Sequence, residues 1–275
     1  MNDIISSNFF CLLASGAFQE KDPIRPMSNY KWKQLFRLAA NHEVTDYIVR
    51  GMELRKDEFF LQQPLGLHEK WKTELTTENT DEEETDTENQ LTAPDHLTNP
   101  LLNHAFQQIL EDDSTTEETH RMMMMLTSIV RYLMNEGFPV RHLVELGLML
   151  RGQGERVDYV TLQNWLEKVR MTKMSSLAGI LLIHLFNFSA EEIPFYTEIP
   201  GIKLDNIIKD VFRQRTSARG TLYFSQGDDI FVHASNTGAL IGHVERSFKY
   251  FRYYPSESVT NFFASFAHSL SHIEE

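Results

Sequence analysis

Two adjacent aspartates form the acidic pair in this sequence that is best placed to do chemistry. Asp228 and Asp229 lie between two short apolar runs, Thr221–Phe224 and Ile230–Val232. Metal-dependent phosphoryl chemistry uses two or three carboxylates that converge on Mg²⁺. Adjacent residues of a regular strand point to opposite faces, so this pair cannot chelate one ion from a strand. Together with Gly227 the pair is more typical of a turn, and a metal site is the alternative.

Two histidines near the C-terminus offer a second possible metal site. His268 and His272 are four residues apart on an expected helix, so both rings would lie on the same face. A metal bound there needs further ligands. No third ligand with suitable spacing accompanies the pair, and two surface histidines at the end of a helix are the simpler interpretation.

One local stretch, Arg246–Tyr254, combines basic and aromatic side chains. Stacking rings and cations together can bind single-stranded nucleic acid, which makes Arg246, Lys249 and Arg252 a possible contact patch. Packing of the rings, with the cations in solvent, explains the same pattern. The chain carries neither a glycine-rich phosphate loop nor a nucleophile elbow.

A short turn between two apolar helices organises the middle of the chain. Gly137 fits the left-handed residue that ends a helix, and Pro139 fits the first turn of the next one. Arg141 and Glu145 are four residues apart at the start of that second helix, where an ion pair is expected. We interpret these four residues as a structural hinge that makes the two helices pack side by side.

The remaining patterns predict a mainly α protein, a multi-helix bundle with a small β-hairpin at about 220–234 near the C-terminus. The hairpin is predicted by two apolar runs around a glycine-containing turn. Ser114 and Glu117 have the spacing of a capping box at the start of the Met-rich helix, and Asp158 and Thr172 are expected caps of later helices. Helices are expected at 4–18 (amphipathic), 28–39, 44–54, 100–110, 114–134, 140–152, 158–169, 172–186, 204–212, 240–250 and 255–271.

Composition divides the chain into an N-terminal helical unit (1–75), an acidic flexible linker (76–99) and a main helical domain (100–275). Eight acids and no Lys or Arg lie between Glu74 and Glu88, and such a segment cannot bury enough apolar surface to fold. The net charge of −13 argues against general nucleic-acid binding. One cysteine, Cys11, excludes an internal disulfide and suits a reducing compartment. No segment predicts a membrane span or a signal peptide, so we expect a cytoplasmic protein.

The hinge sequence carries a resemblance to a known family. The stretch Arg131–Leu150 resembles the helical part of an uncharacterised bacterial nucleotidyltransferase family related to the polymerase-β-like transferases, and the likeness continues through Val157–Val169 and Phe188–Pro194. Glu145 stands where the family has Asp, and Leu146 where it has Trp. Complete members carry a catalytic palm between the N-terminal helices and the hinge, with a Lys-Gly pair and a Gly-Asp-Ile-Asp strand that holds Mg²⁺ against the triphosphate.

That palm has no counterpart here, because neither a Lys-Gly pair nor an Asp-x-Asp strand occurs between Leu65 and Ser114. The resemblance with the palm missing implies a non-catalytic relative, a pseudo-enzyme that acts through a protein partner and needs no cofactor. An active nucleotidyltransferase that uses Asp228 or Asp229 with Mg²⁺ and a nucleoside triphosphate is the first alternative. A nucleic-acid-binding module that uses Lys249 and Arg252 is the second.

Overall fold

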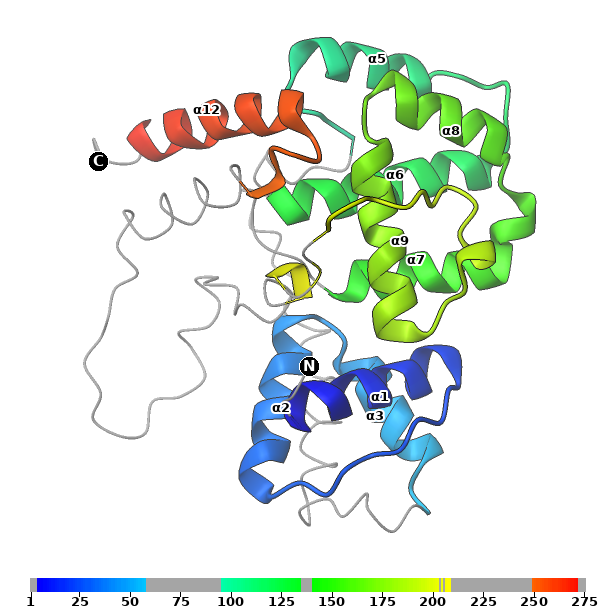
Figure 1. Cartoon of the computed structure of the whole chain (residues 1–275), viewed down its shortest axis with the longest axis vertical. Helices are drawn as coiled ribbons and strands as arrows, with labels where there is room; N and C mark the ends of the chain where they lie inside the picture. The colour runs from blue at the N-terminus through cyan, green and yellow to red at the C-terminus, as the bar shows by residue number, and fades with distance from the viewer. Residues whose placement is uncertain are drawn as a thin grey trace, which may run out of the picture.

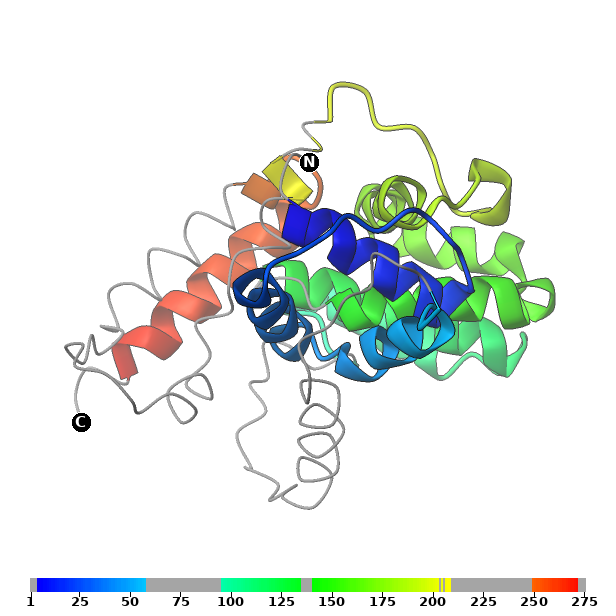
Figure 2. The same cartoon turned by 90° about the horizontal axis from the view of Figure 1, so that it is seen from below.

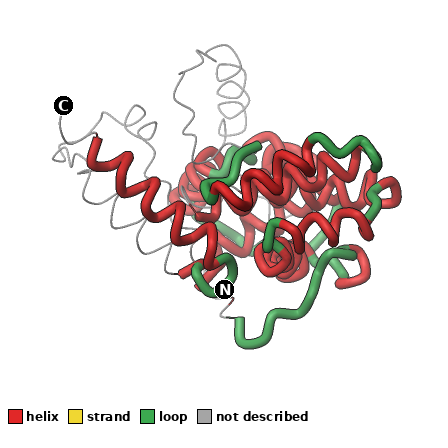
Figure 3. The backbone as a smooth tube through the Cα atoms, turned by 90° about the horizontal axis from the view of Figure 1, so that it is seen from above, coloured by secondary structure: helices red, strands yellow, loops and turns green. Residues whose placement is uncertain are grey.

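A computed structural model describes residues 4–57, 95–134, 140–202, 204, 206–208 and 249–271, with side chains up to Ala264. Every regular element in these ranges is a helix and none is a strand, so the protein is mainly α (Figure 3). The predicted hairpin at 220–234 lies outside the described residues. The elements are α1 (Ile4–Phe18), α2 (Asn29–Asn41), α3 (Thr45–Leu54), α5 (Pro100–Leu110), α6 (Glu117–Met134), α7 (Val140–Gln153), η1 (Gly154–Arg156), α8 (Tyr159–Lys168), α9 (Thr172–Phe186), η2 (Ala190–Glu192) and α12 (Pro255–Ser271).

Helices α1 to α3 form one group, and α5 to α9 form a second group beside it (Figure 1). Helix α6 packs against α7, α8 and α9, and α1 contacts both α7 and α9. The buried apolar side chains form one continuous cluster that runs from Phe9 in α1 to Tyr254 just before α12. The two groups therefore share a hydrophobic core.

Helix α1 is buried on nearly all sides, which corrects the amphipathic interpretation of its sequence. Its buried residues include polar ones, Asn8 and Ser15, as well as Phe9, Phe10 and Leu13. Burying a polar side chain is costly unless it is hydrogen-bonded. Asn8 meets this requirement, because its amide nitrogen donates to the Arg25 carbonyl at 2.7 Å and its oxygen accepts the Arg25 N–H at 3.0 Å.

Glycines allow α1 and α3 to approach each other closely. A Cβ atom at Gly16 would lie 1.9 Å from the Tyr47 carbonyl oxygen, and one at Gly51 would lie 2.1 Å from the Leu12 carbonyl oxygen. Both neighbours are backbone atoms, which cannot move aside as a flexible side chain would. The α1–α3 crossing thus depends on glycine at both positions.

Side-chain caps mark the starts of several helices, and one of them, Asp158, is the cap that the sequence predicts. Ser28, Asn99 and Asp158 are N-caps whose side chains accept backbone N–H groups of α2, α5 and α8. The expected Ser114–Glu117 capping box is wrong, because α6 begins at Glu117. Thr116 takes the capping role instead, since its Oγ1 accepts the Thr119 N–H at 3.3 Å.

Two further local expectations also fail. Thr172 is the first residue of α9 rather than its cap. Val160, which the α8 pattern places inward, is 75% exposed, whereas Leu162, Trp165, Leu166 and Val169 are buried as expected. Val160 is two residues before Leu162, so it lies on the opposite face of α8 from the buried residues.

Arg151 joins the two helical groups. Its guanidinium lies 3.9 Å from the centre of the Phe188 ring and 5.2 Å from that of Phe18. It also pairs with Glu192 at 2.8 Å and with Glu20 at 3.2 Å. These contacts link α7 to the segments that follow α1 and α9, and a cation over an aromatic face is favourable in such a site.

Helix α12 reaches away from the other helices toward the C-terminus (Figures 1 and 2). Its first turns meet the core through buried Glu257, Ser258 and Asn261, while Val259 and Phe263 on another face are exposed. The attachment of α12 to the protein is therefore concentrated near its N-terminal end.

Candidate functional site

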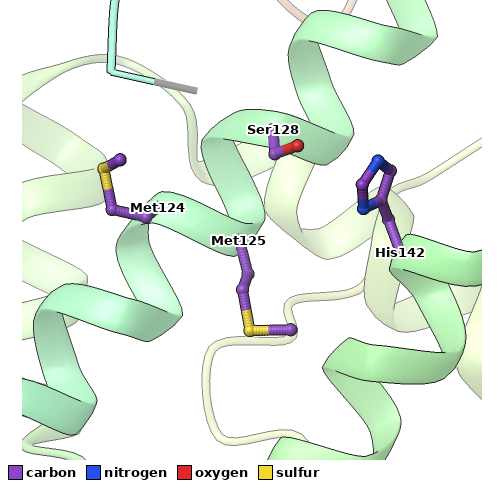
Figure 4. Close-up of a pocket in the computed structure, with 4 residues that line it drawn as sticks. All are labelled: Met124, Met125, Ser128 and His142. Atoms are coloured by element: carbon purple, nitrogen blue, oxygen red, sulfur yellow. The ribbon is translucent and has the colours of Figure 1, made fainter. Parts of the chain in front are cut away.

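A cavity of about 170 Å³ lies between α6 and α7, next to the predicted hinge. It is lined by Met124, Met125 and Ser128 of α6 and by His142 of α7. Figure 4 shows the Ser128 hydroxyl directed toward the His142 ring, with the Met125 thioether below them and Met124 directed to the opposite side. The lining thus combines polarizable apolar groups with two polar atoms, which suits an apolar ligand that carries one hydrogen-bonding group.

The methionine run that includes these residues divides between core and surface. Met122 and Met123 are fully buried, whereas Met124 and Met125 are only partly buried and reach the cavity. Methionines can fill a core or line a binding groove. Core filling holds for the first two residues, and the other two supply the wall of the cavity.

His142 is held in place from two sides. Its ring stacks on Tyr132 of α6 with 4.7 Å between the ring centres, and its Nδ1 lies 3.7 Å from Oε2 of Glu145. Hydrogen bonding from His142 first, and then from Arg141, lowers the pKa of the Glu145 carboxyl against the opposing effect of burial. Glu145 therefore remains ionised beside the imidazole at the edge of the cavity.

Arg141 extends this arrangement to α3. The predicted ion pair with Glu145 is confirmed, with 2.9 Å between Nε and Oε1. The same guanidinium lies 3.5 Å from Asp46 and donates to the Glu43 carbonyl at 2.7 Å. Burial lowers the pKa of Arg141, but these carboxylates raise it more, so the net shift is upward. We name Arg141, Glu145, Asp46 and His142 the hinge cluster.

A second ion pair, between Arg131 and Glu257, is closed to water. Their side chains are 1% and 0% exposed, and Nη1 of Arg131 lies 2.9 Å from Oε1 of Glu257. The Glu257 carboxylate also accepts the backbone N–H groups of Thr98 at 2.5 Å and Asn99 at 2.9 Å. We name this group of four residues the Glu257 latch, because it joins α12, α6 and the residues before α5.

Tyr254 adds a neutral hydrogen bond beside the latch. Its hydroxyl donates to the Val169 carbonyl at 2.7 Å. Burial, and then the Glu257 charge, raises the pKa of Tyr254, so the phenol stays protonated. Burial lowers the pKa of the Arg131 guanidinium, and this effect is larger than the upward effect of the Glu257 charge. With so little exposed surface, the latch is suited to hold helices together and not to meet a substrate.

The sequence did not identify His142, Ser128 or Glu257 as residues of interest. His142 follows Arg141 directly in the first turn of α7. Because that turn was expected to pack beside α6, His142 could have been identified as a residue close to the two helices. Glu257 lies 126 positions from Arg131, and no local pattern joins residues so far apart.

Several predicted site residues lie outside the described residues: Asp228, Asp229, Gly137, Pro139, Arg246 and His272. His268 is described through its backbone alone, as part of α12. Their proposed roles stay predictions. Among the residues that the structure describes, no group of three His, Cys, Asp or Glu side chains is placed to hold a metal ion.

The described half of the basic-aromatic patch is engaged with backbone. Lys249 donates to the Asn206 carbonyl at 2.7 Å, and Arg252 donates to the Pro200 carbonyl at 3.1 Å. Tyr250 and Tyr254 are fully buried, in line with the packing interpretation. The two cations thus tie the 200–208 region to the turn before α12.

Cys11 is half-buried in α1, next to Pro23. Burial first, and then the charge of Asp22, raises the pKa of the thiol. The thiolate is the nucleophilic form of cysteine, so these surroundings favour a structural thiol.

Searches against protein-family models, characterised proteins and solved structures find no match to this chain. The resemblance to nucleotidyltransferases therefore rests on the sequence motifs alone. Within the described ranges, no helix has the length and apolar character needed to cross a membrane.

Proposed function

We propose that this protein is a non-catalytic helical scaffold that binds a protein partner, and that the cavity between α6 and α7 receives an aromatic side chain of that partner. The observation that carries the proposal is the make-up of the cavity, with thioether and imidazole walls. The charged groups beside it support the same function, because Arg141 is engaged in joining α7 to Asp46 of α3 and in an ion pair with Glu145 of its own helix.

The size of the cavity supports a single aromatic ring as the occupant. Its volume is about 170 Å³, which is large enough for one aromatic ring, and it is open to solvent, so that a side chain of a partner could enter. Methionine sulfur makes favourable contacts with aromatic rings. The Ser128 hydroxyl, which faces the cavity (Figure 4), suits a ring with a polar substituent, as in tyrosine.

A tyrosine side-chain analogue tests this proposal directly. We expect p-cresol, at millimolar concentration, to shift the methyl NMR signals of Met124 and Met125 in the intact protein. Met125→Lys should abolish the shift, because a charged chain replaces one apolar wall. Met27→Lys is the matched control, since Met27 is also partly buried but lies outside the cavity.

Calorimetry with a nucleoside triphosphate and Mg²⁺ separates the scaffold from the enzyme alternative. The scaffold predicts no binding at micromolar concentrations. Micromolar nucleotide binding that is lost on changing Asp228 and Asp229 to Asn would favour the nucleotidyltransferase. If p-cresol shifts neither methionine signal, the proposal that an aromatic ring occupies the cavity is wrong. The cavity then no longer supports binding of a protein partner.

A further inference from the structure

Four consecutive methionines on α6 differ in their access to solvent. Met122 and Met123 are fully buried, with 0% of each residue exposed. Met124 and Met125 are only partly buried, and both line the cavity between α6 and α7. Because that cavity is open to solvent, a small molecule in water can reach the second pair of side chains but not the first pair.

Solvent access matters for methionine because peroxides oxidise the thioether sulfur. The sulfur lone pair attacks one oxygen of hydrogen peroxide, the O–O bond breaks, a sulfur–oxygen bond forms, and water leaves with both protons. The sulfur thereby loses two electrons and the peroxide gains them. The product, methionine sulfoxide, is a polar and chiral group in place of a flexible apolar one.

A polar group at Met125 would have a hydrogen-bond donor close by. Met125 and Ser128 are three residues apart on α6, so their side chains are neighbours on the helix surface, and both line the cavity. Figure 4 shows the Met125 thioether below the Ser128 hydroxyl and the His142 ring. A hydroxyl can donate one hydrogen bond. The Ser128 hydroxyl is therefore well placed to donate to a sulfoxide oxygen.

The other methionines that the structure describes do not share this environment. Five of them are buried in the core: Met52, Met134, Met149, Met171 and Met174. Met27 is partly buried, like the two cavity methionines, but it does not line the cavity. Partial burial and a place in the cavity wall thus occur together only at Met124 and Met125 among the described methionines.

We propose that Met124 and Met125 are oxidation sites, and that their oxidation by a peroxide prevents an aromatic ring from binding in the cavity. The sulfoxide puts a polar group into an apolar wall, and an entering ring removes that group from water. Methionine sulfoxide reductases reverse the reaction. The effect on binding rests on the proposed function, whereas the place of oxidation does not.

Peptide mass spectrometry of the full-length protein tests the place of oxidation. Trypsin cleaves after arginine and yields one peptide, 122–131, that contains all four methionines. After graded treatment with hydrogen peroxide, Met124 and Met125 should be oxidised at least about tenfold faster than Met122 and Met123, because buried sulfurs react only through local opening. In denaturant the four rates should be equal. Equal rates in the folded protein would overturn the proposal.

The effect on the cavity is measured by p-cresol binding, followed through the NMR signals of the His142 ring. Peroxide treatment should weaken binding about tenfold, as expected for a polar group that loses its contact with water, and a mixture of the two sulfoxide reductases should restore it. Unchanged binding after oxidation of Met124 and Met125 would overturn the inference and leave the proposed function intact. If the untreated protein does not bind p-cresol, the proposed function fails, and the four oxidation rates still decide the oxidation sites.

Two variants assign the effect to the cavity methionines. Leucine has nearly the volume of methionine but no sulfur to oxidise. In the double variant Met124→Leu/Met125→Leu, the p-cresol affinity should be the same before and after peroxide treatment. Met27→Leu is the matched control, which leaves the cavity unaltered and should lose and regain affinity as the wild type does. A peroxide effect that persists in the double variant would place the sensitive group elsewhere, at Met27 or Cys11, and would overturn the proposal.

Discussion

Arg131 near the end of α6 and Arg141 near the start of α7 lie in opposite environments. Arg131 of the Glu257 latch is 1% exposed, whereas Arg141 of the hinge cluster is 36% exposed. Both contact a carboxylate at 2.9 Å. Although the distances are equal, the two pairs should differ in the free energy lost when they are broken. Breaking the buried pair leaves a charge without water, whereas solvent replaces the partner when the exposed pair is broken.

The difference indicates which contacts between helices cannot open to solvent without a large loss of stability. The latch joins α12 to the residues before α5 across more than 150 positions of sequence. The hinge cluster joins α3 to α7 at the edge of the cavity between α6 and α7. An ion pair at the surface can gain and lose water, whereas an ion pair in the core cannot.

The largest expected effect comes from Glu257→Gln. The amide keeps the shape of the side chain but leaves the Arg131 charge buried without its counter-charge, which should lower the free energy of unfolding by about 3–5 kcal/mol. Chemical denaturation measures this change. Glu117→Gln, which alters a highly exposed ion pair with Arg121, is the control and should change stability by less than about 0.5 kcal/mol.

A double variant sharpens the result. Arg131→Met combined with Glu257→Gln removes both charges, so it should be more stable than Glu257→Gln alone. If the double variant is the less stable of the two, the cost does not arise from an uncompensated charge, and the contrast between the two arginines fails.

The crossing of α1 and α3 depends on close approach of the two backbones. Gly51→Ala places a Cβ atom 2.1 Å from the Leu12 carbonyl oxygen, and we expect a loss of about 1–3 kcal/mol from overpacking. Gly152→Ala is the matched control, because a Cβ atom there meets nothing within 4 Å. Replacing a helical glycine should then stabilise the protein by up to about 1 kcal/mol. Equal effects at the two glycines would contradict the close approach.

Arg151 is an intermediate case, since its side chain is partly exposed but lies over the Phe188 ring. Arg151→Met keeps much of the apolar contact and removes the charge, so we expect a loss of about 1–2 kcal/mol. High salt should reduce the part that comes from Glu20 and Glu192 and leave the ring contact in place. Denaturation at low and at high sodium chloride concentration separates the two contributions, and a difference that vanishes completely in salt would exclude the ring contact.

Much of the helical fold can be predicted from local sequence signals. Pro100 and Pro255 mark the starts of α5 and α12, and Asp158 marks the start of α8, because caps and prolines act on the turn in which they lie. Helix α1 could not be predicted as a central helix, since its burial depends on α3, α7 and α9, which are distant in the sequence.

The candidate site was predictable only in part, for the same reason. The Arg141–Glu145 pair follows from spacing along one helix. The pairing of Arg131 with Glu257 requires knowledge of how helices pack. Sequence periodicity identifies the face of a helix that is buried but not the polar group that it meets there.

The smallest expected effect concerns Glu145 and depends on pH. Its pKa is lowered in the folded protein, chiefly by His142 and Arg141. A carboxyl with a lowered pKa contributes stability above its unfolded pKa, about 4.3, and loses that contribution as the pH falls through the folded value. Glu145→Gln should therefore cost up to about 1 kcal/mol at pH 7 and much less at pH 3, because the group is partly exposed. Glu198→Gln, at an exposed position, should show no such difference. An equal cost of Glu145→Gln at pH 3 and at pH 7 would show that packing, not charge, holds the hinge cluster. The difference between the hinge cluster and the Glu257 latch would then not come from solvent exposure of the ion pairs.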